Sequence, residues 1–292
     1  MHFSDINLSS LQVGGEILLN NPLYSVWHWG FLATGVFFFL SGFGLYYSIQ
    51  RNSPLRSRWL LTQMKKLILP FLFLWVVYLI CFAIWKPSNI NSSLWQYFFT
   101  LRSPGRETWF YQVIIGTYFV TFFIFRYIRN DKFRLPILLG CCFIYIIIMR
   151  KYSTGPWWYN SILNFPMGII CAKYYKNVDR IPDIIILSFS SVIYFIVYRY
   201  IRINIIESLS FTLFIVWIVK YIDIRSRFLK FVGVNSLLFY FLEIPAKYFL
   251  CINFIDNYWL FTIAAIIVTS VIVLIYNHMK TITRLKYCFS SN

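Results

Sequence analysis

The sequence predicts an all-α integral membrane protein, a polytopic helical bundle of about nine transmembrane helices. Of its 292 residues, 59% are hydrophobic and 22% aromatic, and the mean hydropathy is +0.65. Only 13% are charged, against roughly 25% in a typical soluble domain. Long apolar runs bounded by charged residues, proline and glycine recur along the chain, as membrane-spanning helices require. We therefore expect one transmembrane domain over residues 1–292.

Nine apolar runs are candidates for membrane spans. The fourth and fifth are short, and only a tight turn separates the sixth from the seventh. We found no internal repeat and no low-complexity linker between them. The nine expected spans cover residues 26–49, 67–85, 109–125, 135–149, 161–175, 184–201, 205–222, 233–250 and 258–277.

The distribution of basic residues predicts how the chain crosses the membrane. Of the 27 lysines and arginines, 19 lie in the connections after odd-numbered spans, including the C-terminal tail, and 8 lie in the others. Cytoplasmic loops of membrane proteins carry an excess of Lys and Arg. We therefore expect a multi-pass protein of the inner (plasma) membrane, with the N-terminus outside and the C-terminus cytoplasmic. The net charge of +17 is then explained by these loops, and no nucleic-acid partner is expected.

The spacing of cysteine and histidine gives no metal site. The six cysteines form no CxxC pair, and His2, His28 and His278 lie far apart in the sequence. Metal-binding motifs place such ligands at short, regular spacings. No metal is expected, and the cysteines in apolar runs are interpreted as small buried hydrophobic residues.

Small and polar residues interrupt the first expected span. The segment "FFFLSGFG" places Ser41, Gly42 and Gly44 inside an otherwise apolar run. One interpretation is close helix packing, because small residues let two backbones approach each other in a membrane. The other is that the glycines loosen a helix beside a cavity, into which Ser41 offers a hydrogen-bond donor.

Four further segments combine polar or charged groups with apolar runs. "LTQMKKLILP" puts Lys65 and Lys66 at the edge of the second span, where they are either snorkelling anchors or a phosphate site. "RETWFYQ" starts the third span with Trp109, which belongs either to an aromatic belt or to a cavity wall. "FVGVNSLLFYFLEIP" carries Glu243 within a span, where a carboxylate requires a polar partner or a cavity. The fourth segment is "WWYNSILNFPMGIICAKYY".

In their order and spacing, these five segments resemble the membrane acyltransferase 3 family, bacterial O-acyltransferases that modify surface polysaccharides. The resemblance extends over residues 26–277. It implies a bundle of about ten spans with both termini inside, so we expect the family's first span to be missing here and Met1 to be an internal start. It also implies that His2, at the end of that missing span, is the family's catalytic base.

The resemblance implies transfer of an acetyl group from acetyl-CoA, the co-substrate, to a hydroxyl of a glycan or lipid-linked glycan acceptor. A histidine can take the hydroxyl proton near neutral pH, and cations can hold the phosphates of coenzyme A. The family usually has Arg-x-x-Arg before the proline, where this chain has Gln63 and Lys66, and lysine lacks the bidentate fork of arginine. The expected catalytic residues are His2, Ser41, Trp109 and Glu243, and the expected donor-binding residues are Arg58, Lys65 and Lys66.

Two other functions stay open. One is a transporter or flippase of glycan intermediates, in which an aromatic cavity would stack sugars. The other is an N-terminally truncated, inactive acyltransferase. A transporter would need neither Lys65 nor Lys66, so the acyl-donor site discriminates between these functions. His28, between two tryptophans, is interpreted as a belt residue that could replace His2.

Overall fold

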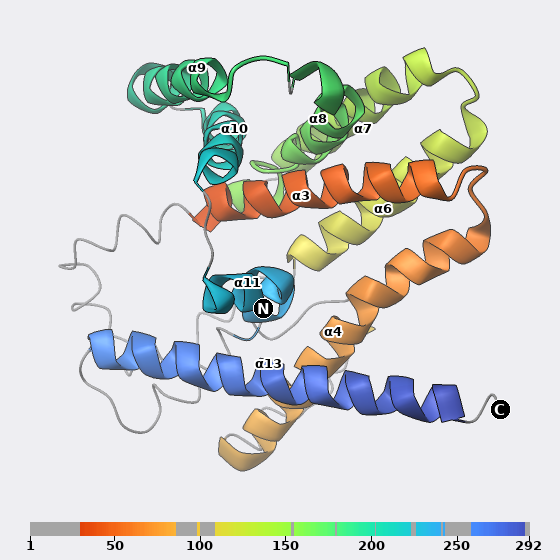
Figure 1. The fold of residues 1–292 in the computed structure, drawn as a ribbon, viewed down its shortest axis with the longest axis vertical. Helices are drawn as coiled ribbons and strands as arrows, with labels where there is room; N and C mark the ends of the chain where they lie inside the picture. The colour runs from red at the N-terminus through yellow and green to blue at the C-terminus, as the bar shows by residue number, and fades with distance from the viewer. Residues whose placement is uncertain are drawn as a thin grey trace. The chain divides into compact units, whose positions relative to one another are not determined.

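In the computed structural model, the described part of the chain is helical (Figure 1). No strand occurs in that part, which confirms the all-α prediction. The structure describes residues 30–85, 98–99, 109–152, 155–178, 180–201, 203–222, 226–240, 242 and 258–289.

Most of these helices lie on the expected spans, and some extend well beyond them. Six of those in the described ranges are long and apolar enough to cross a membrane, so the chain is a multi-pass membrane protein. The count of nine spans stays a prediction, because part of the eighth lies outside the described residues. The helices are α3 (Gly30–Arg51), α4 (Ser57–Trp85), α6 (Trp109–Tyr127), α7 (Asp131–Lys151), α8 (Asn164–Val178), α9 (Asp183–Ile196), α10 (Asn204–Tyr221), α11 (Arg227–Val234) and α13 (Tyr258–Phe289), with short helical turns at Pro156–Trp158 and Val197–Ile201.

The helix α4 differs from its expected span at the N-terminal end. It begins at Ser57 rather than near residue 67. The added residues are mostly leucine, arginine, lysine, glutamine and methionine, which are good helix formers. Lys65 and Lys66 therefore lie within a helix and not in the connection before it.

The ends of α7 illustrate why these helices start and stop where they do. The Asn130 side chain accepts a hydrogen bond of 3.0 Å from the backbone N–H of Lys132, which caps the helix. Asp131 lies in the first turn, and Arg150 and Lys151 lie in the last turn. These charges complement the helix dipole at both ends.

The chain forms two compact units, which are described separately. Unit 1 comprises Met1–Tyr24, Lys65–Thr108 and Arg225–Asn292, and unit 2 comprises Ser25–Met64 and Trp109–Ile224. The first turns of α4 thus belong to unit 2 and the rest of α4 to unit 1.

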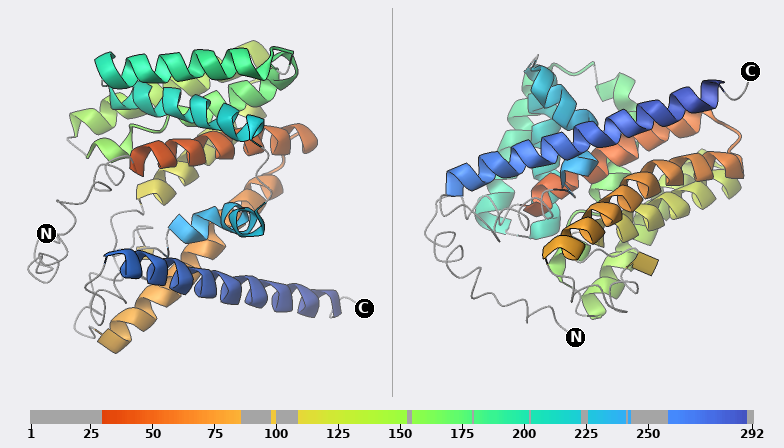
Figure 2. Two further views of the ribbon diagram at one scale, coloured as in Figure 1. Left: turned by 60° about the vertical axis from the view of Figure 1, so that its left-hand side comes forward. Right: turned by 90° about the horizontal axis from the view of Figure 1, so that it is seen from below.

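Unit 2 is organised around α3, which packs against α8 and α10, while α9 runs beside α10 (Figure 2). The contact between α3 and α8 is very close. A Cβ atom at Gly42 would lie under 3.0 Å from the carbonyl oxygen of Phe165, and one at Gly168 would lie equally close to the carbonyl oxygen of Phe39. Gly44 has open space instead. The packing interpretation is confirmed for Gly42 and does not hold for Gly44.

Unit 1 is held together by aromatic contacts along α4. Trp75 of α4 meets Phe98 at 5.4 Å between ring centroids. Phe73 of α4 meets Tyr276 of α13 at 4.9 Å. These rings bring segments that are far apart in the sequence into one unit.

Candidate functional site

The predicted site residues divide into two groups. His2, Glu243 and the substitute base His28 lie outside the described residues, so their placement stays a prediction. The others lie on described helices, and their surroundings follow. They are Ser41, Trp109, Arg58, Lys65 and Lys66.

Ser41 lies where three helices of unit 2 meet. Its side chain, on α3, is hydrogen-bonded to the hydroxyl of Tyr118 on α6. The ring of Tyr118 packs against Phe165 of α8, with 6.0 Å between centroids. Ser41 is half-buried. Tyr118 was not predicted from the sequence, because a lone tyrosine in an apolar run gives no distinctive signal.

Trp109 begins α6 and is buried, with 8% of its surface exposed. Its ring contacts Phe110 at 6.2 Å and Trp158 at 6.3 Å. At 1.5 Å per residue, Tyr118 lies about 13 Å further along α6. The structure therefore does not bring Trp109 and Ser41 to one point, although the two residues share unit 2.

Asn235 belongs to unit 1. It ends α11, and its side-chain oxygen accepts a hydrogen bond of 2.9 Å from the amide of Asn277 on α13. Its own amide donates to the carbonyl of Phe231, also at 2.9 Å. The described contacts of Asn235 thus serve to join α11 to α13.

The donor-binding residues expected on α4 are all exposed: Arg58, Lys65 and Lys66. Gln63, at the position of the family's first arginine, is buried and donates a hydrogen bond of 3.0 Å to the hydroxyl of Ser48. The departure from the family pattern therefore has a structural explanation, because this glutamine joins α4 to α3.

A buried polar cluster between α3, α8 and α10 was not predicted. The Asn164 amide donates to the hydroxyl of Ser208 at 2.9 Å and to the carbonyl of Ser161 at 3.1 Å. Its oxygen Oδ1 and the hydroxyl of Thr212 are buried without a hydrogen-bond partner among the described residues. A Cβ at Gly35 would lie under 3.0 Å from a polar atom of Asn164, Ser208 and Thr212 alike. The only feature of the sequence that could have indicated this cluster is the presence of polar residues inside apolar runs.

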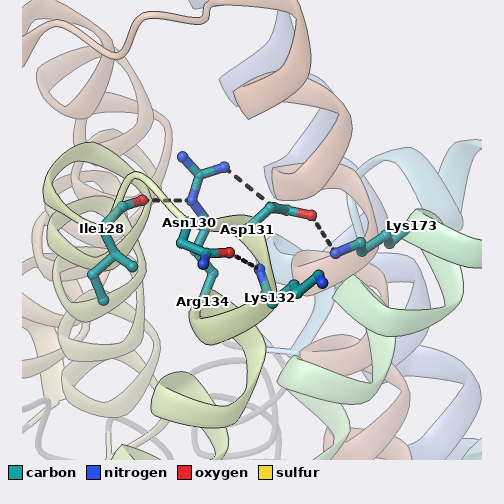
Figure 3. A network of polar contacts seen from close by, with 6 residues as sticks. All are labelled: Ile128, Asn130, Asp131, Lys132, Arg134 and Lys173. Carbon is teal, nitrogen blue, oxygen red and sulfur yellow. Dashed lines mark hydrogen bonds and ion pairs between the residues drawn. The ribbon is translucent and has the colours of Figure 1, made fainter.

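Asp131 organises the end of unit 2 where α6 leads into α7 (Figure 3). Its carboxylate accepts hydrogen bonds from Lys173 of α8 and, at 3.2 Å, from Arg134. Arg134 also donates to the carbonyl of Ile128 at 2.8 Å. This network joins α6, α7 and α8.

A second ion pair lies at the same end of unit 2. Lys220 of α10 donates to Asp183 of α9 at 2.8 Å. The Lys220 ammonium also lies over the rings of Trp217 and Tyr175, at 4.8 and 6.0 Å from their centroids, and Tyr175 belongs to α8. We call this the basic end of unit 2. Its described cations are Arg51, Arg56, Arg58, Arg126, Arg129, Lys132, Arg134, Lys173, Arg180 and Lys220.

Comparison with known families decides the class of protein. The acyltransferase 3 family model, described as an acyltransferase domain, matches residues 2–278. The chain belongs to the acyltransferase 3 family. This confirms the resemblance inferred from the five segments, and it makes the chain an acyltransferase of a family embedded in the membrane. No curated protein and no solved structure matches the chain with significance.

Proposed function

We propose that this acyltransferase is a membrane O-acetyltransferase. It transfers an acetyl group from acetyl-CoA to a hydroxyl of a cell-surface polysaccharide or of its lipid-linked precursor. The observation that carries the proposal is the family match over residues 2–278. The transmembrane helices support an acceptor that is made at the membrane.

The reaction needs a base and an oriented hydroxyl. The hydroxyl oxygen of the sugar attacks the carbonyl carbon of the thioester while the base takes the hydroxyl proton. The carbon–sulfur bond then breaks, and the base returns the proton to the leaving thiolate, which releases coenzyme A as its thiol. We assign the base to His2, since an imidazole takes a proton near neutral pH. We assign Ser41 to orientation of the acceptor, because its half-buried hydroxyl lies beside that of Tyr118, where α3, α6 and α8 meet.

In this proposal, residues of α4 bind the phosphate groups of coenzyme A. Arg58, Lys65 and Lys66 are exposed on α4. Cations of this kind bind phosphate oxygens by charge-assisted hydrogen bonds. Acetyl-CoA is a cytoplasmic metabolite in this scheme, so we place these residues on the cytoplasmic side of the inner membrane, as the distribution of Lys and Arg predicts.

The proposal is tested in the host that produces the glycan. The gene is deleted and then restored with the wild-type chain, with the chain carrying Lys65→Gln and Lys66→Gln, or with a control carrying Lys151→Gln. Lys151 is an exposed lysine in the last turn of α7. We measure O-acetyl groups on the isolated glycan by NMR.

We expect deletion to remove O-acetyl groups, and the wild-type chain and the Lys151→Gln control to restore them. The double variant should restore fewer. An unchanged acetyl content after deletion would contradict the proposal. If deletion instead stops the appearance of glycan at the surface, and the double variant restores it fully, the transporter function is favoured.

A further inference from the structure

Arg126, in the last turn of α6, lies against the first residue of α4. Its Nη1 atom donates a hydrogen bond of 2.8 Å to the hydroxyl of Ser57. Arg56 and Arg58 flank Ser57 in the chain. The fold therefore places Arg126 beside the segment of chain that carries Arg56 and Arg58, within unit 2. We call Arg56, Arg58 and Arg126 the arginine corner.

Buried aromatic side chains pack next to the arginine corner. The ring of Trp59 stacks on Phe122 at 6.0 Å with an interplanar angle of 15°, and both rings are buried. The indole N–H of Trp59 donates to the hydroxyl of Ser48 at 2.9 Å, which fixes α4 against α3. The guanidinium of Arg126 lies over Phe122, 5.4 Å from the ring centroid. These contacts hold Arg126 in position before any ligand binds.

The three arginines have no acidic partner among the described residues, unlike Arg134, Lys173 and Lys220 at the same end. Lys173 pairs with Asp131, and Lys220 pairs with Asp183. Over the described ranges, no carboxylate forms an ion pair with any arginine of the corner. Adjacent positive charges repel one another, and a bound anion relieves that repulsion.

We propose that the arginine corner binds a phosphate group, with Arg126 as a ligand that was not predicted from the sequence. The planar guanidinium donates two parallel hydrogen bonds that match phosphate oxygens. The phosphate comes either from the nucleotide part of the acyl donor or from the headgroup of an anionic lipid. The first source rests on the proposed function, and the second does not.

The experiment measures binding of coenzyme A to the full chain in nanodiscs of phosphatidylcholine. Four chains are compared: wild type, Arg126→Gln, Arg58→Gln and the control Lys132→Gln. Lys132 is exposed at the same end, so its replacement removes the same charge away from the corner. We expect each arginine variant to raise the Kd about tenfold or more, as the loss of a charge-assisted hydrogen bond predicts, and the control to change it less than about twofold.

A second arm distinguishes the two sources of phosphate. Nanodiscs that also contain phosphatidylglycerol are analysed by native mass spectrometry for lipid that stays bound to the chain. Loss of bound phosphatidylglycerol in Arg126→Gln and Arg58→Gln, with an unchanged Kd for coenzyme A, assigns the corner to a lipid headgroup. If neither ligand responds to either variant, or if Lys132→Gln has the same effect, the proposal is overturned.

Two features keep this test independent of folding and of the proposed function. Arg58 has no side-chain partner among the described residues, so Arg58→Gln reports on binding even if Arg126→Gln disturbs the fold. Binding of coenzyme A that depends on the corner, in a chain that transfers no acetyl group, contradicts the proposed function and leaves the phosphate site standing. If the chain transfers acetyl groups but its Kd for coenzyme A does not depend on the corner, the proposed function stands and the corner is not the site that binds coenzyme A.

Discussion

Gly42 of α3 lies against the backbone of Phe165 in α8, so close that a methyl group there would overlap the Phe165 carbonyl oxygen. Gly168 of α8 faces the carbonyl of Phe39 in the same way. The two helices therefore touch backbone to backbone at two reciprocal positions. In lipid, where apolar side chains gain little by leaving the solvent, such close packing drives helix association.

We predict that Gly42→Ala destabilises the protein, whereas Gly44→Ala does not. The added methyl group at Gly42 meets the carbonyl of Phe165 and forces the helices apart, at a cost of about 1–3 kcal/mol. Gly44 has open space, so alanine there should be neutral or stabilise α3 by up to about 1 kcal/mol. Thermal unfolding in detergent, followed by size-exclusion chromatography, measures the difference. Equal melting temperatures for the two variants would show that the backbone contact is absent.

The buried polar cluster predicts opposite outcomes for two hydroxyls on α10. Ser208→Ala removes the acceptor of the Asn164 amide and should cost about 0.5–1.5 kcal/mol. Thr212→Val replaces a buried hydroxyl that has no partner among the described residues, and it should be neutral or stabilising. The same unfolding measurement applies to both. Destabilisation by Thr212→Val as large as that by Ser208→Ala would mean that the Thr212 hydroxyl is bonded.

Ser48 is predicted to be a stability determinant of unit 2. Its hydroxyl accepts hydrogen bonds from the indole of Trp59 and the amide of Gln63, and both donors lie on α4. Ser48→Ala removes this shared acceptor from two buried side chains, at a cost of about 1–3 kcal/mol. The control is Ser191→Ala, since Ser191 bonds only to a carbonyl of its own helix among its described contacts. If the two alanine variants unfold at the same temperature, the link between α3 and α4 is unimportant.

The proposed donor site predicts a kinetic effect of the lysines on α4. In a transfer assay, the Lys65→Gln and Lys66→Gln double variant should raise KM for acetyl-CoA about tenfold and change kcat little, because the phosphates are remote from the reacting carbonyl. Lys151→Gln should change neither constant. Since both lysines are exposed, the effect should weaken as ionic strength rises. An unchanged KM would place the donor elsewhere.

The sequence was sufficient to predict the class of fold and most helix positions, because apolar runs of span length have few alternatives in a membrane. It was less informative about where helices end. The second span was expected near residue 67, whereas α4 starts at Ser57, since polarity marks the edge of the hydrocarbon and not the end of a helix. The glycines of "FFFLSGFG" showed the same limit: composition indicated close packing, but only coordinates separate Gly42 from Gly44.

Residues that act through distant partners could not be identified from the sequence. In the sequence, Arg126 resembles any other basic residue at a helix end. Its position beside α4 follows from its hydrogen bond to Ser57, which is far away in the chain. Tyr118 gains its importance from Ser41 in the same way. Conversely, Trp109 was correctly expected at the start of a helix, but it lies about 13 Å along α6 from Tyr118, the residue that contacts Ser41.

The most direct test of the central claim follows the acetyl group itself. The purified full chain is reconstituted in vesicles with lipid-linked glycan from its host and with acetyl-CoA labelled in the acetyl group. The account predicts that label appears on the glycan as a base-labile ester, in step with the release of coenzyme A thiol. The account is contradicted if coenzyme A thiol is released but no glycan carries the label. It is also contradicted if the chain binds coenzyme A but the labelled acetyl-CoA stays unreacted.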